Sequence, residues 1–413
     1  MFKSPLVLAI AASLLVACGE TESRSAADAS TAPAATAPAT ATPAPAAVAA
    51  TDAATAGTAA MTQGHTFTTT EVAKFNAPWA MTFLPDGRLL VTEMAGALRL
   101  YDPAANTTGT VTGTPETGRV SQGGLGDVVL HPQFADNGMV YLSYVETGEG
   151  GLGGAVARAK LVMDEQGGGK LENLEVIWRQ SPKLSGEGHF GYRIAFDRDG
   201  MLWISSSERQ AFDPAQDMAS NLGKIIRLKD DGTLPADNPF ADRKDVGAQA
   251  WSLGHRNILG LAFDANGQLW AHEMGPKGGD EFNRIEKGVN YGYPIVSNGD
   301  HYDGREIPDH ETRPEFVPPA ITWNPVISPA GLVIYSGTQF PAWQGNAFIG
   351  GLSSKALVRV AFDGNGGASE AQRFDMQRRI REVEQGPDGA LWLLEDGNKD
   401  GQGWLLKLTP SPL

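Results

Sequence analysis

A short pattern of apolar and polar residues recurs along the chain. It consists of an apolar pair, a turn in which Asp or Asn precedes Gly, and a run of β-forming residues. Asp-Gly or Asn-Gly between alternating apolar residues predicts a β-hairpin. The clear copies are FLPDGRLLVTE at 83–93, FDRDGMLWISS at 196–206, FDANGQLWAHE at 263–273 and EQGPDGALWLLE at 384–395.

Two looser copies bring the number of predicted hairpins to six. They are LHPQFADNGMVYLSY at 130–144 and the segment 331–351. Six hairpins within residues 62–413 predict an all-β fold, a six-bladed β-propeller of four-stranded antiparallel blades. The spacing is long for such blades and implies insertions. A decorated β-sandwich stays open here, because widely spaced hairpins do not prove radial closure.

The same hairpins predict where a functional site lies. The residue six positions beyond each clear turn glycine is polar, namely Glu93, Ser206, Glu273 and Glu395. Four equivalent strands therefore deliver polar side chains to one end of the structure, which we expect to be the working face. Solvated strand ends would also be polar, so this spacing locates a site without identifying its chemistry.

The start of the chain is expected to be a targeting signal. Lys3 precedes a mostly apolar run at 5–17, which is too short to cross a bilayer comfortably. The run ends in Leu-Val-Ala-Cys, which resembles the lipobox of bacterial lipoproteins. We therefore expect a lipoprotein signal peptide at 1–17 and a lipid on Cys18, which would anchor the protein to a membrane. An ordinary export signal is the alternative.

The composition of residues 18–61 predicts a disordered tether. The segment is dominated by Ala, Thr, Ser and Pro, has no aromatic residue, and offers almost nothing to bury. Its prolines keep it extended and interrupt helices. Gly19, directly after the cysteine, hints at the outer membrane. We expect a lipid-anchored protein of the bacterial cell envelope, at the outer membrane facing the periplasm, with its folded part at 62–413.

Composition excludes several classes of protein. The 33 Lys and Arg against 48 Asp and Glu give a net charge of -15, which argues against nucleic-acid binding. A single cysteine excludes an internal disulfide framework, a cysteine-based zinc site and a dithiol redox centre. The 50 Gly and 26 Pro favour a turn-rich fold over a helical bundle.

One histidine stands out as a candidate base. His189 lies in the glycine-rich loop SGEGHFGYR, directly before a predicted strand. Histidine has a pKa near the working pH of most enzymes, as a general base requires. Glu208, at the far end of the same hairpin, is placed to hydrogen-bond the imidazole and fix its tautomer. A solvated loop histidine and a surface carboxylate are the alternatives.

Several cations also fall in loops beside the hairpins. In an acidic protein, converging guanidinium groups indicate an anionic ligand that carries carboxylates or phosphates. Each of them has an alternative role as the partner of one of the many acids. The residues are Arg256 with its neighbour Asn257, Lys355, Arg378, Arg379 and Arg381.

The segment GPKGGDEFNRI, directly after a predicted strand, is rich in hydrogen-bond acceptors. The carbonyls of Gly275 and Pro276 are suited to a hard cation, which takes oxygen ligands from the backbone. The signal is weak by itself, because no Asp-x-Asp-x-Asp-Gly series is present.

Taken together, these motifs resemble those of the soluble quinoprotein aldose (glucose) sugar dehydrogenases. These enzymes are six-bladed propellers that use pyrroloquinoline quinone (PQQ) and Ca2+. The resemblance runs from about residue 77 to the end of the chain. Its motifs are SQGGLGDVVLHPQF, EGHFGYRIAFDRDG, NLGKIIRLKDDGTLPADNPF, GHRNILGLAFDANGQLWAHEMGPKGGDEFNRI, GVNYGYP, SSKALVRV and RIREVEQGPDG, in that order.

The resemblance implies a role for each candidate residue. His189 matches the base that takes the proton of the sugar's anomeric hydroxyl, and Glu208 matches the carboxylate that supports it. The carbonyls of Gly275 and Pro276 match Ca2+ ligands. Trp323 matches an aromatic residue that packs on the quinone plane. The remaining cofactor contacts match Gln122, Arg256, Asn257, Lys355, Arg379 and Arg381.

Three positions depart from the family pattern. Leu259 stands where the glucose dehydrogenases have Gln, Gly188 replaces an acidic neighbour of the base, and Glu208 is longer than the usual Asp. We expect these changes to alter cofactor affinity and sugar preference. Loops shorter than those of dedicated glucose enzymes predict a broad range of aldose substrates, with an unidentified electron acceptor.

Two other functions remain compatible with a propeller. A Ca2+-dependent lactonase would surround a central metal with side-chain oxygens and would not need Lys355, Arg379 and Arg381. A membrane-tethered binding propeller would have no turnover at all. Convergence of His189 with the cations on one cavity is the arrangement that favours the dehydrogenase.

Overall fold

A computed structural model describes residues 67–397 and 401–411, all within the unit Thr58–Leu413. The predicted signal peptide, Cys18 and the tether lie outside the described residues. Within the described ranges, helices long and apolar enough to cross a bilayer are absent.

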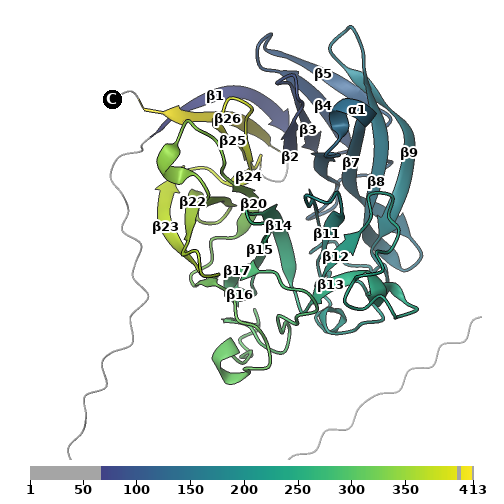
Figure 1. The fold of residues 1–413 in the computed structure, drawn as a ribbon, viewed down its shortest axis with the longest axis vertical. Helices are drawn as coiled ribbons and strands as arrows, with labels where there is room; N and C mark the ends of the chain where they lie inside the picture. Colours follow the sequence, from purple (N-terminus) through teal and green to yellow (C-terminus); the bar gives the residue numbers. More distant parts are fainter. Residues whose placement is uncertain (1–66, 398–400, 412–413) are drawn as a thin grey trace, which may run out of the picture. The chain divides into compact units, whose positions relative to one another are not determined.

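The described residues fold into antiparallel β-sheets with only short helices between them (Figure 1). The largest sheet has the order β2 (Pro78–Phe83), β3 (Leu89–Glu93), β4 (Ala97–Asp102), β5 (Thr107–Thr112), β9 (Gly169–Arg179), β8 (Gly151–Met163), β7 (Met139–Gly148) and β6 (Leu125–Leu130). Another sheet has the order β1 (Phe67–Asn76), β26 (Gln402–Pro410), β25 (Leu391–Glu395) and β24 (Ile380–Gln385).

Three further sheets have four strands each. The first contains β10 (Gly191–Phe196), β11 (Leu202–Ser206), β12 (Lys224–Leu228) and β13 (Ala250–Leu253). The second contains β14 (Asn257–Phe263), β15 (Leu269–Met274), β17 (Asp280–Arg284) and β19 (Ile321–Trp323). The third contains β20 (Pro329–Ile334), β21 (Ala347–Gly351), β22 (Ala356–Phe362) and β23 (Ala368–Asp375).

The remaining elements are short. A two-stranded ribbon joins β16 (Lys277–Gly278) to β18 (Gly299–Asp300). The only α-helix of the described residues is α1 (Phe134–Asn137). The 3-10 turns are η1 (Asp213–Ala215), η2 (Val246–Gln249), η3 (His310–Thr312) and η4 (Pro341–Trp343).

All six predicted hairpins are confirmed, as β2–β3, β6–β7, β10–β11, β14–β15, β20–β21 and β24–β25. The turn glycines of the four clear copies, Gly87, Gly200, Gly267 and Gly389, have φ of 91°, 77°, 84° and 82°. Only glycine adopts this left-handed region without a steric penalty, so these residues set the turns.

The eight-stranded sheet consists of two parts that meet at a short seam. Its strands are antiparallel except where β5 meets β9. That parallel pairing covers only Val111 with Gly169 and Thr112 with Lys170. Each part, β2–β5 and β6–β9, is a four-stranded antiparallel sheet by itself.

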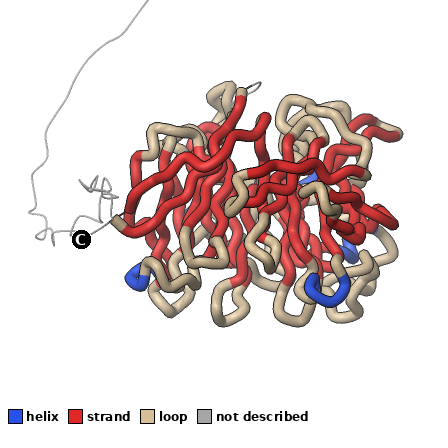
Figure 2. The backbone as a smooth tube through the Cα atoms, turned by 90° about the horizontal axis from the view of Figure 1, so that it is seen from above, coloured by secondary structure: helices blue, strands red, loops and turns tan. Residues whose placement is uncertain are grey.

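Four of the six first strands, β2, β14, β20 and β24, are labelled near the middle of the unit (Figure 1). In the order β2, β6, β10, β14, β20 and β24, each contacts the next, and β24 contacts β2. Strands form the middle of this unit and loops gather at its two ends (Figure 2). The all-β prediction is confirmed, and the ring of strands excludes a simple two-layer stack.

The apolar core lies between neighbouring sheets. Each of the six spaces around the ring holds one apolar cluster that draws on the sheets at both sides. One cluster, for example, joins Phe75 and Met81 to Trp392 and Leu394. Because every sheet is covered on both faces, strands such as β3, β11 and β21 are buried along their whole length.

Both described ends of the chain lie in one sheet. The N-terminal strand β1 is antiparallel to the C-terminal β26, with Phe67 opposite Pro410 and Asn76 opposite Gln402. This pairing completes the sheet that begins with β24 and β25.

Candidate active site

A cavity of about 510 Å³ opens at the end of the sheets that the hairpin spacing predicts as the working face. Met94, Met274 and Asp396 line it, and each directly follows a polar strand end, Glu93, Glu273 or Glu395. Glu93 and Glu273 themselves are buried. The cavity therefore lies at the strand ends that the spacing predicts, but Met94, Met274 and Asp396 are one position further along the chain than the predicted residues.

His189 lines the cavity and is bonded to Glu208. Its Nδ1 lies 2.5 Å from Oε1 of Glu208, and both side chains are buried. The second oxygen of Glu208 accepts a hydrogen bond from the backbone N of Phe212 at 2.9 Å. An anionic carboxylate at Nδ1 requires a proton there, which leaves the lone pair on Nε2 of the neutral ring.

The charge states of this pair suit a base. Burial lowers the pKa of His189, although the hydrogen bond to Glu208 opposes the shift. Burial alone would raise the pKa of Glu208, but the hydrogen bond and the charge of His189 hold it below its usual value. Near neutral pH the imidazole is therefore neutral and the carboxylate is ionised, as general-base catalysis requires.

The backbone around His189 is fixed from several sides. Its N donates to Oε1 of Gln122 at 3.0 Å, and its φ is 48°, a left-handed value unusual for a residue other than glycine. A side chain at Gly188 would meet Oε1 of Gln210 at 2.5 Å. Gln210 thus fills the space beside Gly188 that a side chain at this position would need.

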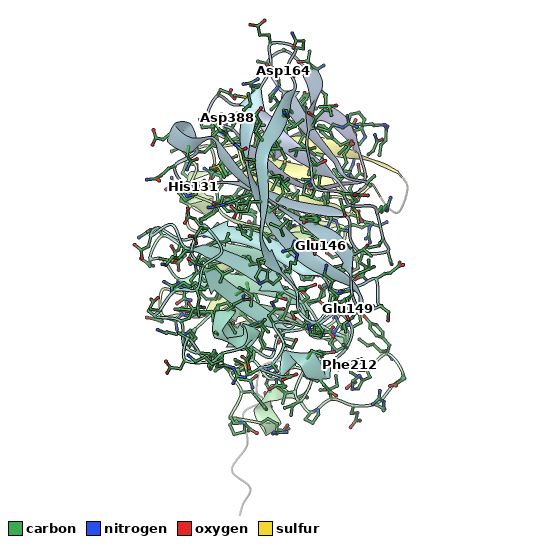
Figure 3. The ribbon with its side chains drawn as sticks, turned by 90° about the vertical axis from the view of Figure 1, so that its right-hand side faces the viewer. His131, Glu146, Glu149, Asp164, Phe212 and Asp388 are labelled. Carbon is green, nitrogen blue, oxygen red and sulfur yellow. The ribbon has the colours of Figure 1, made fainter. Side chains whose placement is uncertain are left out.

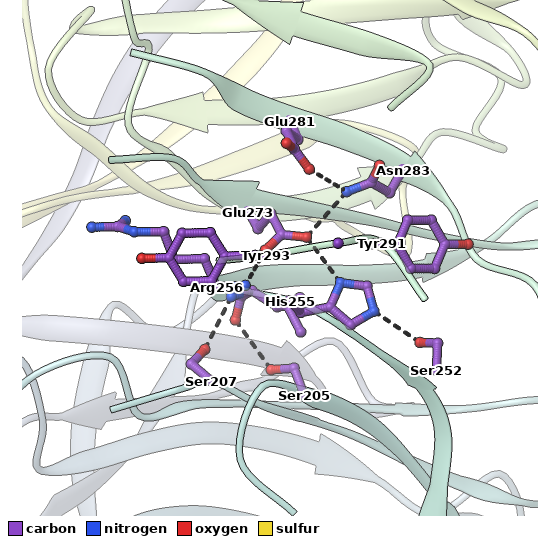
Figure 4. A network of polar contacts seen from close by, with 12 residues as sticks. Ser205, Ser207, Ser252, His255, Arg256, Glu273, Glu281, Asn283, Tyr291 and Tyr293 are labelled. Carbon is purple, nitrogen blue, oxygen red and sulfur yellow. Dashed lines mark hydrogen bonds and ion pairs between the residues drawn. The ribbon is translucent and has the colours of Figure 1, made fainter. Parts of the chain in front are cut away.

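Arg256 and Asn257 line the cavity next to a buried carboxylate network (Figure 4). Oε2 of Glu273 accepts the backbone N–H of Arg256 at 2.5 Å, and Oε1 lies 2.9 Å from Nδ1 of His255. Nε2 of His255 lies 2.8 Å from the hydroxyl oxygen of Ser252. Since Glu273 is buried and receives these donors, it holds the main chain of Arg256 in place.

Arg379 and Arg381 line another part of the cavity wall, around Asp396. Nε of Arg379 donates to Asp396 at 2.8 Å, and Nη2 of Arg381 lies 3.4 Å from the other oxygen of Asp396. Burial would raise the pKa of Asp396, but Arg381 and Arg379 hold it below its usual value. One ionised carboxylate therefore faces two guanidinium groups, which leaves net positive charge at the wall.

Gly275 and Pro276 also line the cavity. The carbonyl of Gly275 accepts a hydrogen bond from Arg256 at 2.6 Å, and its N–H donates to Asp280 at 2.9 Å. Asp280 lines the cavity too, and burial raises its pKa to about 6. Among the described residues, clusters of three or more His, Cys, Asp or Glu side chains suited to a metal ion are absent.

The structure does not bring Trp323 or Lys355 into this cavity. Trp323 is buried in the apolar cluster between the β14 and β20 sheets, and its Nε1 donates to Glu370 at 2.7 Å. Its side chain points between sheets because β19 is an outer strand of its sheet. Lys355 is exposed in the loop between β21 and β22. The aromatic residues that line the cavity are instead Trp79, Phe190, Tyr192 and Tyr302.

Arg378 also points elsewhere, toward Glu71 and Glu395. Sequence reasoning missed several cavity residues. They are Trp79, Arg119, Ser121, Asp280, Tyr302 and Asp396. A strand-end signal was available for Asp396, which follows Glu395.

A buried ion-pair cluster supports the cavity floor. Arg193 of β10 pairs with Glu382 of β24, and its Nη1 lies 3.5 Å from Asp127 of β6. Its guanidinium lies over the ring of Trp79, 4.1 Å from the centroid, and its Nε donates to the carbonyl of Leu259 at 2.9 Å. Trp79 and Leu259 both line the cavity, so Arg193 fixes two parts of the floor from below.

Comparison with known proteins gives a consistent picture. The family model of glucose/sorbosone dehydrogenase matches residues 75–407. The chain is 37% identical over 344 residues to the aldose sugar dehydrogenase YliI of Escherichia coli (strain K12), covering 82% of this chain and 91% of that protein.

Solved structures resemble the same unit. The crystal structure of the soluble aldose sugar dehydrogenase of Escherichia coli in its apo-form has a TM-score of 0.77 at 36% identity, covering 84% of this chain and 100% of that one. The PQQ-bound form of the aldose sugar dehydrogenase of Streptomyces coelicolor has a TM-score of 0.67 at 27% identity, covering 83% and 98%.

Proposed function

The chain belongs to the glucose/sorbosone dehydrogenase family, the family of the soluble PQQ-dependent aldose sugar dehydrogenases, and from this premise we propose that it oxidises aldoses at C1 to lactones. PQQ and Ca2+ are its cofactors. His189 is the general base, and Glu208 is the carboxylate that orients it. The proposal rests on one observation above all, the convergence of His189, Arg256, Arg379 and Arg381 on one cavity.

The proposal includes a six-bladed propeller with four strands in each blade. The closed cycle of six first strands supports it, as do the six apolar clusters between sheets. The eight-stranded sheet then counts as two blades, because only two residue pairs connect β5 to β9. The additional ribbon of β16 and β18 belongs to an insertion in the fourth blade.

The residues of the cavity fit PQQ, a flat molecule with three carboxylates. Arg119, Arg256, Arg379 and Arg381 line the cavity and offer guanidinium donors that match carboxylates in pairs. Within the described residues, Nε of Arg256, Oδ1 of Asn257 and Nε of Arg381 are buried without a hydrogen-bond partner. Polar atoms of this kind are suited to a bound polar group.

When bound, PQQ supplies a quinone that accepts a hydride, and Ca2+ acts as a Lewis acid beside it. The protein's part is to place the sugar and remove its proton. The C1 hydroxyl proton passes to Nε2 of His189 as the C1 hydrogen leaves with its electron pair. Glu208 stabilises the imidazolium that results, because its carboxylate stays ionised.

For Ca2+ we propose the carbonyls of Gly275 and Pro276 as ligands. The carbonyl of Gly275 retains a lone pair beyond its bond to Arg256, and calcium accepts backbone oxygens readily. Asp280 fixes this segment through Gly275, and also bonds the backbone N of Ile327 at 2.8 Å and of Ser328 at 2.7 Å. The carboxylate would also contribute negative charge close to the cation.

The test is oxidation of an aldose by the purified full-length chain with an artificial electron acceptor. Reduction of the acceptor that requires both PQQ and Ca2+ supports the proposal. Opening of a lactone without PQQ would instead identify a Ca2+-dependent lactonase. Specific binding of a ligand without turnover would identify a binding propeller. The physiological electron acceptor is a separate partner.

We propose, finally, that lipid on Cys18 holds the enzyme at the outer membrane, facing the periplasm. The lipobox-like sequence and the Ala/Thr/Pro-rich tether support this location. The test compares the natural chain with Cys18→Ala. The variant should take up no metabolic lipid label and should no longer be recovered in the membrane fraction. A natural chain that takes up no label would refute the anchor.

A further inference from the structure

Two aromatic side chains are exposed near the mouth of the cavity, and the proposed chemistry does not use either. Tyr302 lines the cavity together with His189, yet 75% of it is exposed, the largest value for a big apolar side chain among the described residues. Phe212 is 40% exposed, and Figure 3 labels it near the margin of the molecule. Exposed aromatic surface beside a pocket is typical of a binding surface.

The two side chains belong to one aromatic surface, which we call the aromatic rim and which consists of Phe212, His301 and Tyr302. The ring centroids of Phe212 and His301 are 5.5 Å apart, with 66° between their planes. Phe212 also lies 6.4 Å from the ring of Tyr293. His301 directly precedes Tyr302, so the loop that carries the cavity residue Tyr302 is also the loop that contacts Phe212.

Both segments of the rim are anchored to the active site. The loop that carries Tyr302 follows β18, which pairs with β16 next to Gly275 and Pro276. The loop is closed by a hydrogen bond from the N of His301 to the carbonyl of Arg305 at 3.0 Å. On the other side, the N of Phe212 donates to the carboxylate of Glu208. Movement of the rim is therefore limited by the same contacts that shape the cavity.

The backbone at Phe212 is strained. Its φ of 63° and ψ of -83° are unfavourable for an aromatic residue, and the N of Asp213 donates to the carbonyl of Ala211 at 2.9 Å to close a γ-turn. Strain of this kind persists where the surrounding structure enforces it, and it concentrates at ligand-binding sites. Here it holds a ring partly in water.

We propose that the aromatic rim binds the second sugar ring of a disaccharide whose reducing end enters the cavity. The inference rests on the proposed function. A cavity of about 510 Å³ lies within the size range of small-molecule sites, and we assign it to the flat cofactor and one sugar ring. A second ring must then lie outside the mouth, beside Tyr302. The C–H face of a pyranose packs on an aromatic ring while its hydroxyl groups stay hydrated.

The test compares maltose with glucose in the enzyme loaded with PQQ and Ca2+. In Tyr302→Ala the ratio of kcat/KM for maltose to that for glucose should fall about 3- to 10-fold. Tyr302→Phe keeps the ring and should keep the ratio. Phe212→Gly removes the other ring, suits the positive φ, and retains the N–H that bonds Glu208, so the ratio should fall there too.

The matched control is Leu174→Ala, which removes another exposed apolar side chain, on β9. The proposal that the rim binds the second sugar ring would be overturned if the maltose-to-glucose ratio of kcat/KM were unchanged in both Tyr302→Ala and Phe212→Gly. An equal fall of this ratio in the control would also overturn it. Calorimetric binding of maltose to the loaded protein separates this failure from failure of the proposed function. If the natural chain oxidises neither sugar, maltose binding that is lost in Tyr302→Ala still supports the rim, and no binding overturns it.

Discussion

His189 is oriented through both its backbone and its ring. The hydrogen bond from the backbone N–H of His189 to Gln122 holds the backbone in its conformation with positive φ, while Glu208 fixes the tautomer of the ring. Such orientation matters because a base must reach its proton in one particular geometry. In the proposed mechanism the left-handed conformation at His189 serves this orientation, and the contacts around it maintain the conformation.

His189→Ala should lower kcat about 10²- to 10⁴-fold, because a general base is removed while the cationic wall of the cavity stays intact. Binding of PQQ, followed by the absorbance of the bound cofactor, should be retained. His131→Ala is the control, since His131 does not line the cavity. A loss of less than tenfold would show that another group takes the proton.

The pH dependence of activity follows from the same pair. The base works only as neutral imidazole, so activity falls as the pH drops through the pKa of His189. Because that pKa is lowered, activity should persist below the usual histidine value of about 6.5. In Glu208→Gln the carboxylate no longer raises the pKa, so the acid limb of kcat/KM should move to still lower pH. A shift to higher pH would contradict this assignment.

Residue type and spacing predicted part of the site. Alternation along a strand explains why Arg379 and Arg381 share the cavity while Arg378 faces Glu71. The same rule, however, needs the orientation of the strand, which the sequence does not provide. Trp323 shows the consequence. Its ring was predicted to pack on the cofactor plane, but in the structure it packs between two sheets.

At the level of elements, the segment between β15 and β17 joins the cavity to the aromatic rim. Asp280 accepts three backbone N–H groups, from Gly275, Ile327 and Ser328, and so connects two loops. Each buried donor left without a partner would cost about 1–3 kcal/mol. This carboxylate is therefore the main constraint on the predicted calcium ligands.

Asp280→Ala should weaken Ca2+ binding about 10- to 100-fold, because partners that orient metal ligands contribute effects of this size. The measurement is the Ca2+ concentration needed for half-maximal binding of PQQ. Glu175→Ala, which removes an exposed acid on β9, is the control. Equal Ca2+ requirements in the two variants would show that Asp280 does not support the metal site.

The hairpins could be predicted because their information is local. A turn glycine and two flanking apolar runs specify two strands within about a dozen residues. The β16–β18 ribbon could not be predicted in this way, since its strands have two residues each and lie about twenty positions apart. The loop with Tyr302 depends on that ribbon, which explains why the rim was missed.

Across the whole molecule, the pair of Arg193 and Glu382 connects strands that are not neighbours in the ring. The neighbours of β10 are β6 and β14, whereas those of β24 are β20 and β2. The pair therefore spans the centre, and Asp127 adds a third strand to it. Burial of charges is costly unless they are paired, so this contact depends on correct closure of the ring.

Arg193→Met should lower the free energy of unfolding by about 3–5 kcal/mol, because it leaves Glu382 and Asp127 buried without their cation. Urea denaturation followed by tryptophan fluorescence measures the change. Arg243→Met removes an exposed partner of Asp245 and should leave the free energy of unfolding nearly unchanged. Similar losses in the two variants would contradict a special role for the central pair.

Closure of the ring was the least predictable part of the fold. The strands β1 and β26 are more than three hundred residues apart, and neither contains a turn signal that points to the other. Repetition of the hairpins suggested a ring, but only the contacts between the first strands establish the order of the sheets.

The pairing of β1 with β26 also affects how the polypeptide folds during its synthesis. The strand β1 is synthesised more than three hundred residues before its partner β26. Until β26 is made, both β1 and the edge of β25 expose unsatisfied backbone groups, which favour association with other nascent chains. Truncated products that lack β26 are therefore expected to aggregate and to require chaperones or proteolysis, even though every active-site residue has already been synthesised.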